Sequence, residues 1–163
     1  MTGAVFAVAA LVGSLFVIAG VEDARTQQVS IRIGRTTTVV AIVGLGAIGL
    51  IATEWTQLVQ ALVGALLVTG IQVVPYLLQS GRRSGQTGEW IGRADVRFGV
   101  PFGWTLGWFG VGFAVVGFAV ALVAGLIASA VTGRRRIPFV PYLAVGLWAG
   151  LAWALARSLA GGA

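Results

Sequence analysis

The sequence contains no cysteine, no histidine and no lysine. Without cysteine the chain has no disulfide, no thiolate nucleophile and no cysteine-bound metal. Without histidine it has no Ser-His or Cys-His pair, and without lysine it has no Walker A lysine, no Schiff base and no Ser-Lys dyad. The chemistry left to this protein is that of carboxylates, arginine, hydroxyl groups and the backbone.

Charge is also scarce. Only 10% of the 163 residues are charged and 58% are hydrophobic, whereas a soluble domain carries about 25% charged residues. So little polar surface cannot cover a globule of this size, so the composition predicts an integral membrane protein. The net charge is +6, from 11 arginines against five acidic residues, which are Glu22, Asp23, Glu54, Glu89 and Asp95.

Uncharged runs of about 20 residues predict helices that cross a hydrocarbon core of about 30 Å. The first three runs cover about residues 2–21, 36–53 and 58–78, and a polar turn at 54–57 separates the last two. Residues 79–97 are polar and rich in glycine, which predicts a long loop.

The uncharged segment 98–131 is too long for one span, and glycines at 107, 110 and 112 predict a break within it. The segment then forms a short fourth span and a full fifth. Prolines at 138 and 141 are typical of the first turn of a sixth helix, which runs to about residue 159. The predicted fold is all-α, a polytopic helical bundle of about six transmembrane helices that forms one integral-membrane domain over 1–163.

The arginines predict how this bundle is oriented. The loops after spans one, three and five hold ten of the 11 arginines, and only Arg157 lies on the other side. By the positive-inside rule these loops are cytoplasmic and both termini are outside. A five-span arrangement would put arginines 134–136 outside, so the charge distribution favours six spans.

Two aspartates lie where a predicted cytoplasmic loop meets a span. Asp23 follows the first span and Asp95 precedes the fourth, so we expect both at similar depth. If they face each other they can share one proton, the ionised carboxylate activating water while the protonated one donates a hydrogen bond to a carbonyl oxygen. On position alone, interfacial charges paired with Arg25 and Arg97 are the simpler interpretation.

Three segments around these positions carry further information. They read VEDARTQQVSIRIG from residue 21, IGRADVRFGVPFGWTLGW from residue 91 and GRRRIPFVPYLAVGLWAG from residue 133. Together they resemble the type IV prepilin peptidase family, polytopic aspartic proteases of the bacterial cytoplasmic membrane. The segments are similar, in the family's order and spacing, to its D-x-R-x-x-x-I-P, G-x-G-D-V-K/R and K/R-x-I-P-F-G-P-x-L-A-x-G motifs. The resemblance covers nearly the whole chain.

The resemblance implies that Asp23 and Asp95 are the catalytic pair, with Arg25 and Arg97 two places after each. It implies an aspartic endopeptidase that cleaves the short basic leader of prepilin-like proteins at the cytoplasmic face, with no metal or organic cofactor. The chain looks like the short stand-alone form associated with Flp or Tad pili, a peptidase without N-methyltransferase activity. The implied partners are a prepilin-like substrate and membrane lipid, and not nucleic acid.

The chain departs from the family's motifs at three places. Ser30 stands where the family usually has proline, Ala94 replaces the glycine before the second aspartate, and Val140 replaces a glycine of the third motif. Gly92 and Asp95 of the second motif are kept. If position 94 requires a positive φ or a close approach of substrate, alanine there reduces activity.

Other charged residues near the motifs have candidate roles. Glu22 and Glu89 can attract a basic leader, although Glu89 fits equally well as a solvated loop charge. Arg25 and Arg97 are expected to point to headgroups or substrate, because pairing with the aspartates would oppose the protonation of one of them.

Two other classes of protein remain open. A peptidase-like protein that binds pilin precursors or assembly components without cleaving them is motivated by Ala94. A small transporter that uses Asp23 and Asp95 as proton or cation sites is less favoured, because both fall at one membrane edge whereas transport sites usually lie near the midplane. A neighbouring prepilin gene would favour the peptidase or the non-cleaving binder, and pH-driven solute flux would favour the transporter.

Overall fold

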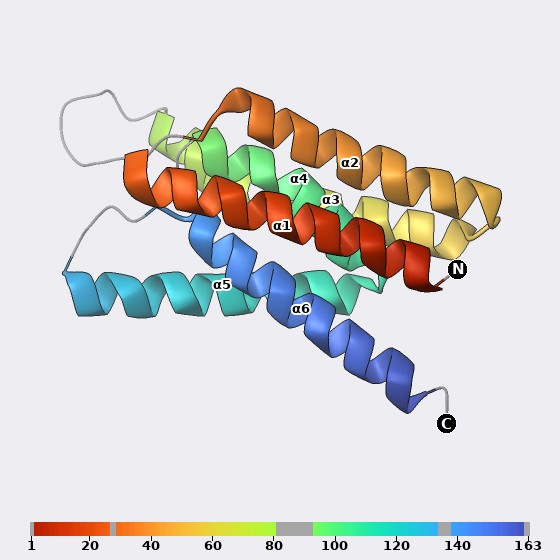
Figure 1. The fold of residues 1–163 in the computed structure, drawn as a ribbon. Helices are drawn as coiled ribbons and strands as arrows, with labels where there is room; N and C mark the ends of the chain where they lie inside the picture. Colours follow the sequence, from red (N-terminus) through yellow and green to blue (C-terminus); the bar gives the residue numbers. More distant parts are fainter. Residues whose placement is uncertain (1, 27–28, 81–92, 134–137, 162–163) are drawn as a thin grey trace.

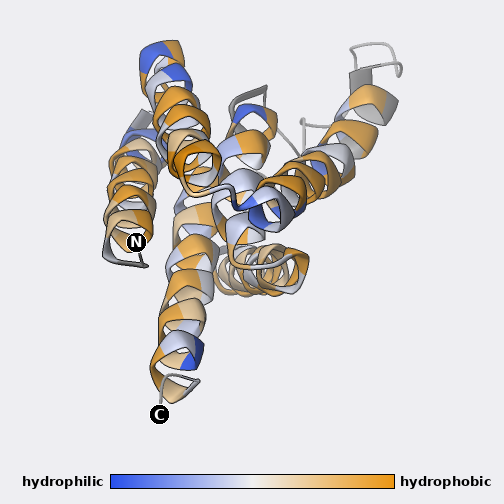
Figure 2. Cartoon of the chain, turned by 90° about the vertical axis from the view of Figure 1, so that its right-hand side faces the viewer, coloured by the Kyte–Doolittle hydropathy of each residue, from blue (hydrophilic) through white to orange (hydrophobic). Residues whose placement is uncertain are grey.

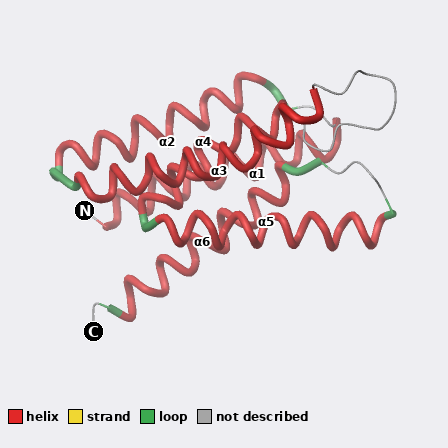
Figure 3. Tube along the Cα trace, turned by 180° about the vertical axis from the view of Figure 1, so that it is seen from behind, coloured by secondary structure: helices red, strands yellow, loops and turns green. Residues whose placement is uncertain are grey.

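The computed structural model describes residues 2–26, 29–80, 93–133 and 138–161, and all statements below concern these ranges. They form six α-helices and no strand (Figure 1 and Figure 3). The helices are α1 (Thr2–Thr26), α2 (Ile31–Ile51), α3 (Trp55–Ser80), α4 (Arg93–Trp108), α5 (Val111–Thr132) and α6 (Val140–Ala160). The predicted all-α bundle of six helices is confirmed.

Five of these helices, all except α4, are long and apolar enough to cross a membrane. Their outward faces carry large apolar side chains, such as Leu66 and Leu126, which are 66% and 69% exposed. Hydrophobic residues extend along most of each helix (Figure 2). The chain is therefore a multi-pass membrane protein. The short fourth helix was also predicted correctly, since α4 has 16 residues and spans only about 24 Å.

Successive helices run in opposite directions, so alternate connections lie at the same end of the bundle (Figure 1 and Figure 3). At one of these ends α1, α3 and α5 finish and α2, α4 and α6 begin, and we call it the Asp23 end. The two chain termini lie at the opposite end (Figure 1). The first and second predicted aspartate positions are thus at the same end of the fold.

The short helix α4 is the centre of the bundle and contacts all five other helices. It crosses α3 through glycines, and the closest approach is at Gly103 against Gly64. A Cβ on Gly107, one turn along α4, would lie 2.6 Å from the carbonyl oxygen of Gln60. Small residues four apart let two backbones approach this closely, which is how helices associate inside a bilayer.

Five phenylalanines join α1, α4, α5 and the start of α6, and we call them the phenylalanine chain. The ring centroids of Phe16 and Phe98 are 5.0 Å apart, and those of Phe16 and Phe102 are 6.2 Å apart. Phe102 contacts Phe118, which in turn contacts Phe139, both at 6.2 Å. All four contacts are edge-on, the arrangement that favours aromatic pairs.

The observed helices are longer at the Asp23 end than the sequence predicted. α1 continues beyond residue 21 to Thr26, α2 begins at Ile31 instead of residue 36, and α4 begins at Arg93 instead of residue 98. Charged residues that hydropathy assigned to loops therefore form helix ends, because a helix can continue past the hydrocarbon into the headgroup region, where charges are solvated. Within the predicted loop 79–97, residues 81–92 lie outside the described ranges.

The other end of the bundle needs one correction. Residues 55–57, expected in the turn before the third span, already belong to α3, so the turn is confined to residues 52–54.

Three predicted helix boundaries are confirmed. The break between the fourth and fifth helices lies at Gly110, whose φ of +132° and ψ of 144° suit glycine alone. α5 is closed by Gly133 in the left-handed conformation, and the Gly133 N–H donates to the carbonyl oxygen of Ser129 at 2.9 Å. Pro141 lies in the first turn of α6, as expected, whereas Pro138 precedes that helix.

The turn between α2 and α3 contains one strained residue, Thr53, with φ of +58°. A β-branched residue is disfavoured at positive φ, whereas asparagine adopts this conformation readily. We expect Thr53→Asn to raise the free energy of unfolding by about 1 kcal/mol, measured by thermal unfolding in detergent. Thr56→Asn, in the first turn of α3, is the matched control and should change little, because both residues have similar helix propensity. Equal effects of the two substitutions would contradict the assignment of strain.

Candidate functional site

Asp23 is buried in the last turn of α1, with 5% of its surface exposed. Its carboxylate oxygen Oδ2 accepts a hydrogen bond of 3.3 Å from the backbone N–H of Val140. Val140 is the first residue of α6 and is itself fully buried. The first predicted motif therefore contacts the third, across 117 residues of sequence.

This contact gives Asp23 a structural role. The first N–H groups of a helix have no partner within it, and a carboxylate there also interacts favourably with the helix dipole. The N-cap residue of α6, Phe139, makes no side-chain capping bond of its own. Asp23 supplies this cap from α1, so the same carboxyl group that could take or give a proton also fixes the position of α6.

Glu22, the neighbour of Asp23, organises the connection to α2. Its Oε2 accepts a hydrogen bond of 3.1 Å from the backbone N–H of Ser30, and the Ser30 hydroxyl accepts one from the N–H of Arg32. Ser30 is thus the N-cap of α2. A proline, which the resembled family usually has here, could not donate to Glu22. The serine at position 30 is therefore explained by the local structure. Because Oε2 of Glu22 accepts this bond, only its other oxygen is left to interact with a basic leader.

Asp95 lies in the first turn of α4, at the same end of the bundle as Asp23. The contact between Phe16 and Phe102 relates the two helices. Asp23 follows Phe16 by seven residues along α1, and Asp95 precedes Phe102 by seven along the antiparallel α4. Seven residues are two helical turns, or about 10 Å, and return to nearly the same helix face. Both aspartate positions therefore lie one heptad beyond the contact, toward the Asp23 end.

The position of the two aspartates corrects the sequence prediction in one respect. We expected Asp23 directly after a span and Asp95 directly before one, but both belong to helices. Ala94 is also helical, a conformation in which alanine is the most favourable residue. Position 94 of this chain therefore has no requirement for a positive φ.

The remaining predicted residues are partly described. Arg25 and Arg97 are exposed at the Asp23 end, on α1 and α4. Gly92 and Glu89 lie outside the described ranges. The structure brings together the Asp23 carboxylate and the start of α6. A second contact joins Glu22 of α1 to Ser30, the residue that precedes α2.

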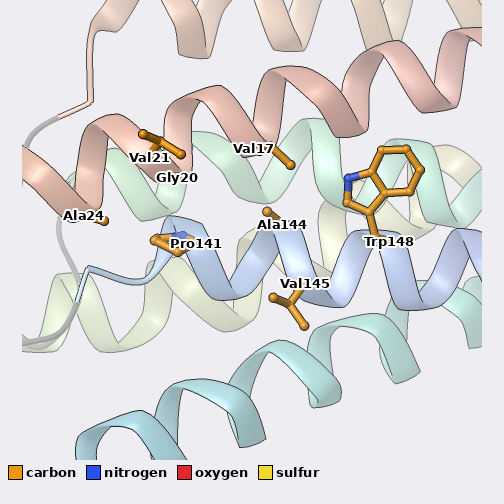
Figure 4. Close-up of a pocket in the computed structure, with 8 residues that line it drawn as sticks. All are labelled: Val17, Gly20, Val21, Ala24, Pro141, Ala144, Val145 and Trp148. Carbon is orange, nitrogen blue, oxygen red and sulfur yellow. The ribbon is translucent and has the colours of Figure 1, made fainter. Parts of the chain in front are cut away.

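An apolar groove of about 500 Å³ runs along the contact between α1 and α6 (Figure 4). Two close contacts flank it. A Cβ on Gly20 would lie 3.0 Å from Cα of Pro141, and one on Gly13 would lie 2.9 Å from the indole of Trp148. The groove is lined by Val17, Gly20, Val21, Ala24, Pro141, Ala144, Val145 and Trp148. Since its three valines are about half exposed, the groove opens toward the lipid.

Sequence reasoning missed two features of this end of the bundle. The Val140 N–H is a backbone group, and no side chain in the sequence signals it. Gln72 of α3 is an amide in an apolar span and is 1% exposed, and a polar residue within a span is a functional signal that the sequence did contain.

Comparisons with family models, with curated proteins and with solved structures gave no match. Within the described ranges, no group of three acidic side chains gathers to hold a metal ion. The interpretation of the site therefore depends on its motifs and its geometry.

Proposed function

We propose that this protein is a membrane aspartic endopeptidase that removes the short basic leader of prepilin-like precursors, without N-methyltransferase activity. The observation that carries the proposal is the bond from the Val140 N–H to the buried Asp23 carboxylate. This bond joins the first and third motif segments, and the register through Phe16 and Phe102 brings the second to the same end. Three segments that are far apart in the sequence thus converge on one end of a membrane bundle.

The proposed chemistry needs two carboxyl groups and water. The ionised carboxylate takes a proton from water as the water oxygen attacks the scissile carbonyl carbon, and the protonated carboxyl group donates to the carbonyl oxygen. The C–N bond then breaks, and the leaving amine takes up a proton from the pair. Asp23 and Asp95 are the two groups, and no metal or organic cofactor enters the reaction.

We place the Asp23 end at the cytoplasmic face of the bacterial inner membrane. The segments that connect helices at this end, together with the adjoining turns of the helices, contain ten of the 11 arginines of the chain, in agreement with the positive-inside rule. The basic leader of a precursor is made in the cytoplasm and would reach both aspartates from that side.

The groove between α1 and α6 suits the hydrophobic segment that follows the leader in such a precursor. Its lining is apolar and includes Gly20, Ala24 and Ala144, small residues that allow a helix to approach closely. Its lining extends along α1 to Ala24, the neighbour of Asp23 in the sequence, so a helix seated there would have its cytoplasmic end near the level of Asp23.

Filling this groove should impair cleavage without unfolding the protein. Val17 is 45% exposed and lies six residues before Asp23 on α1. We expect Val17→Trp to raise KM for the precursor about tenfold, because the indole occupies space the substrate helix needs. Val43→Trp is the control, since Val43 is 61% exposed on α2, away from the groove. Equal KM values for both variants would exclude the groove as the docking site.

The test of the function is cleavage of a co-expressed Flp-type prepilin from the same genome, read as a mobility shift. Conversion to the shorter product by the wild-type protein supports the peptidase. Retention of an uncleaved precursor that co-purifies with the protein would instead support a non-cleaving binder of pilin precursors, the alternative that the Ala94 departure motivates.

A further inference from the structure

The contact between α1 and α6 separates Asp23 from the groove. Ala24 is exposed and lines the groove, whereas its neighbour Asp23 is 5% exposed. The carboxylate of Asp23 accepts its hydrogen bond from the N–H of Val140, which is fully buried. The carboxyl group therefore lies behind the contact between the two helices, and a peptide in the groove does not reach it while that contact is closed.

Backbone atoms close this contact next to Asp23. A Cβ on Gly20 would lie 3.0 Å from Cα of Pro141 and 3.3 Å from its backbone nitrogen. Pro141 faces α1 beside this glycine (Figure 4). Gly20 lies one turn before Asp23 on α1, and Pro141 directly follows the residue that donates to Asp23. We call these two contacts together the seam.

Further along the chain, α6 is anchored to α5. Gly146 of α6 meets Gly117 of α5 backbone to backbone. This crossing is six residues after Val140, or about 9 Å along the helix. The contact with α1 at this depth is of another kind, because Gly13 meets the indole of Trp148, a side chain that can rotate. The first turn of α6 can therefore move away from α1 while the helix stays fixed at its crossing with α5.

We propose that the start of α6 is a gate, and that the peptide to be cleaved enters between α1 and α6 at the seam; this inference rests on the proposed function. The structure is the closed state, which the bond from the Val140 N–H to Asp23 holds together. A precursor helix in the groove touches both walls of the seam, and the chain that precedes this helix passes between the walls when the gate opens. Opening breaks the bond to Val140 and frees the carboxylate oxygen for water and the scissile peptide.

The test is a disulfide that locks the seam. The chain has no cysteine of its own, and a Cβ on Gly20 would lie 3.6 Å from Cβ of Pro141, within the range of about 3.5 to 4.5 Å that a disulfide needs. We expect the Gly20→Cys/Pro141→Cys protein to lose prepilin cleavage when copper phenanthroline oxidises it. Cleavage should return when dithiothreitol reduces the bond, so the same protein serves as its own reference.

Val8→Cys/Gly44→Cys is the matched control. A Cβ on Gly44 would lie 3.7 Å from Cβ of Val8, so this disulfide joins α1 to α2 with similar geometry and leaves α6 free. Oxidation should not change its cleavage. Full cleavage by the oxidised Gly20→Cys/Pro141→Cys protein would overturn the gate, and so would an equal loss in the two oxidised proteins.

A second assay needs no cleavage and separates this inference from the proposed function. A precursor with a single cysteine, at the junction between its leader and its hydrophobic segment, is oxidised together with Asp23→Cys, Ala24→Cys or Ala41→Cys. We expect disulfide-linked precursor at positions 23 and 24 and none at Ala41→Cys, which replaces a fully buried residue of α2.

This assay also decides the matter if the double variant does not fold or the wild-type protein cleaves no precursor. Absence of cleavage refutes the peptidase, whereas linkage at position 23 still supports a gate that admits a bound precursor. Linkage at position 24 alone would show that the peptide stays in the groove, and linkage at neither position would show that the groove holds no precursor. Either of these two results refutes the gate.

Discussion

Asparagine in place of Asp23 should abolish prepilin cleavage and leave the protein folded in the membrane. Asparagine can still accept the hydrogen bond from the Val140 N–H, so α6 keeps its cap. It cannot take up or release the catalytic proton, so we expect a loss of at least about a hundredfold in cleavage rate. The measurement is the fraction of precursor processed at equal membrane levels of the two proteins.

Asp23→Ala separates the two roles of this carboxylate. Alanine removes the cap as well as the proton, so this variant should be inactive and also lose about 1 kcal/mol of stability. Asp95→Asn should be inactive with normal stability. Normal processing by either asparagine variant would refute the catalytic pair. An unfolded Asp23→Asn protein would show that the capping interaction needs the negative charge.

The largest loss of stability is expected from one methyl group at Gly103. A Cβ there would collide with the carbonyl oxygen of Gly64 and would lie 2.7 Å from Cα of Ala65. These are backbone atoms, so α3 and α4 must separate to make room. Overpacking costs about 1 to 3 kcal/mol where side chains can move, and we expect Gly103→Ala to reach at least the upper value.

Gly70→Ala is the matched control on α3, because a Cβ at Gly70 meets nothing within 4 Å. Alanine is favoured over glycine in a helix by about 1 kcal/mol, so this variant should be as stable as the wild type or more so. Thermal unfolding in detergent measures both. A Gly103→Ala protein that unfolds at the temperature of Gly70→Ala would mean that α3 and α4 do not cross here.

The helices could be predicted from the sequence because bilayer thickness sets the length of an apolar run. The glycine breaks at Gly110 and Gly133 were equally readable, since positive φ selects glycine. The ends of α1, α2 and α4 were not, because hydropathy marks the edge of the hydrocarbon and not the end of hydrogen bonding.

The site was only partly predictable. The pattern of the two aspartates and the alternation of helices predicted one shared end, and the fold has both positions there. The cap that Asp23 gives to α6 depends on a backbone N–H, which every residue except proline has. The surroundings of Gln72 depend on where α3 and α4 cross at Gly99. No local sequence pattern indicates which residues of two helices lie opposite each other.

The phenylalanine chain has a consequence for the membrane's electrical insulation. Carboxyl groups inside a bilayer can act as steps of a proton relay, and a proton leak would lower the membrane potential. Phe16, Phe98 and Phe102 fill the interior beyond Asp23, almost fully buried, with no atom that can carry a proton. Phe118 and Phe139 extend this layer to α5 and α6. These rings therefore offer no group that could relay a proton from Asp23 toward the opposite end of the bundle.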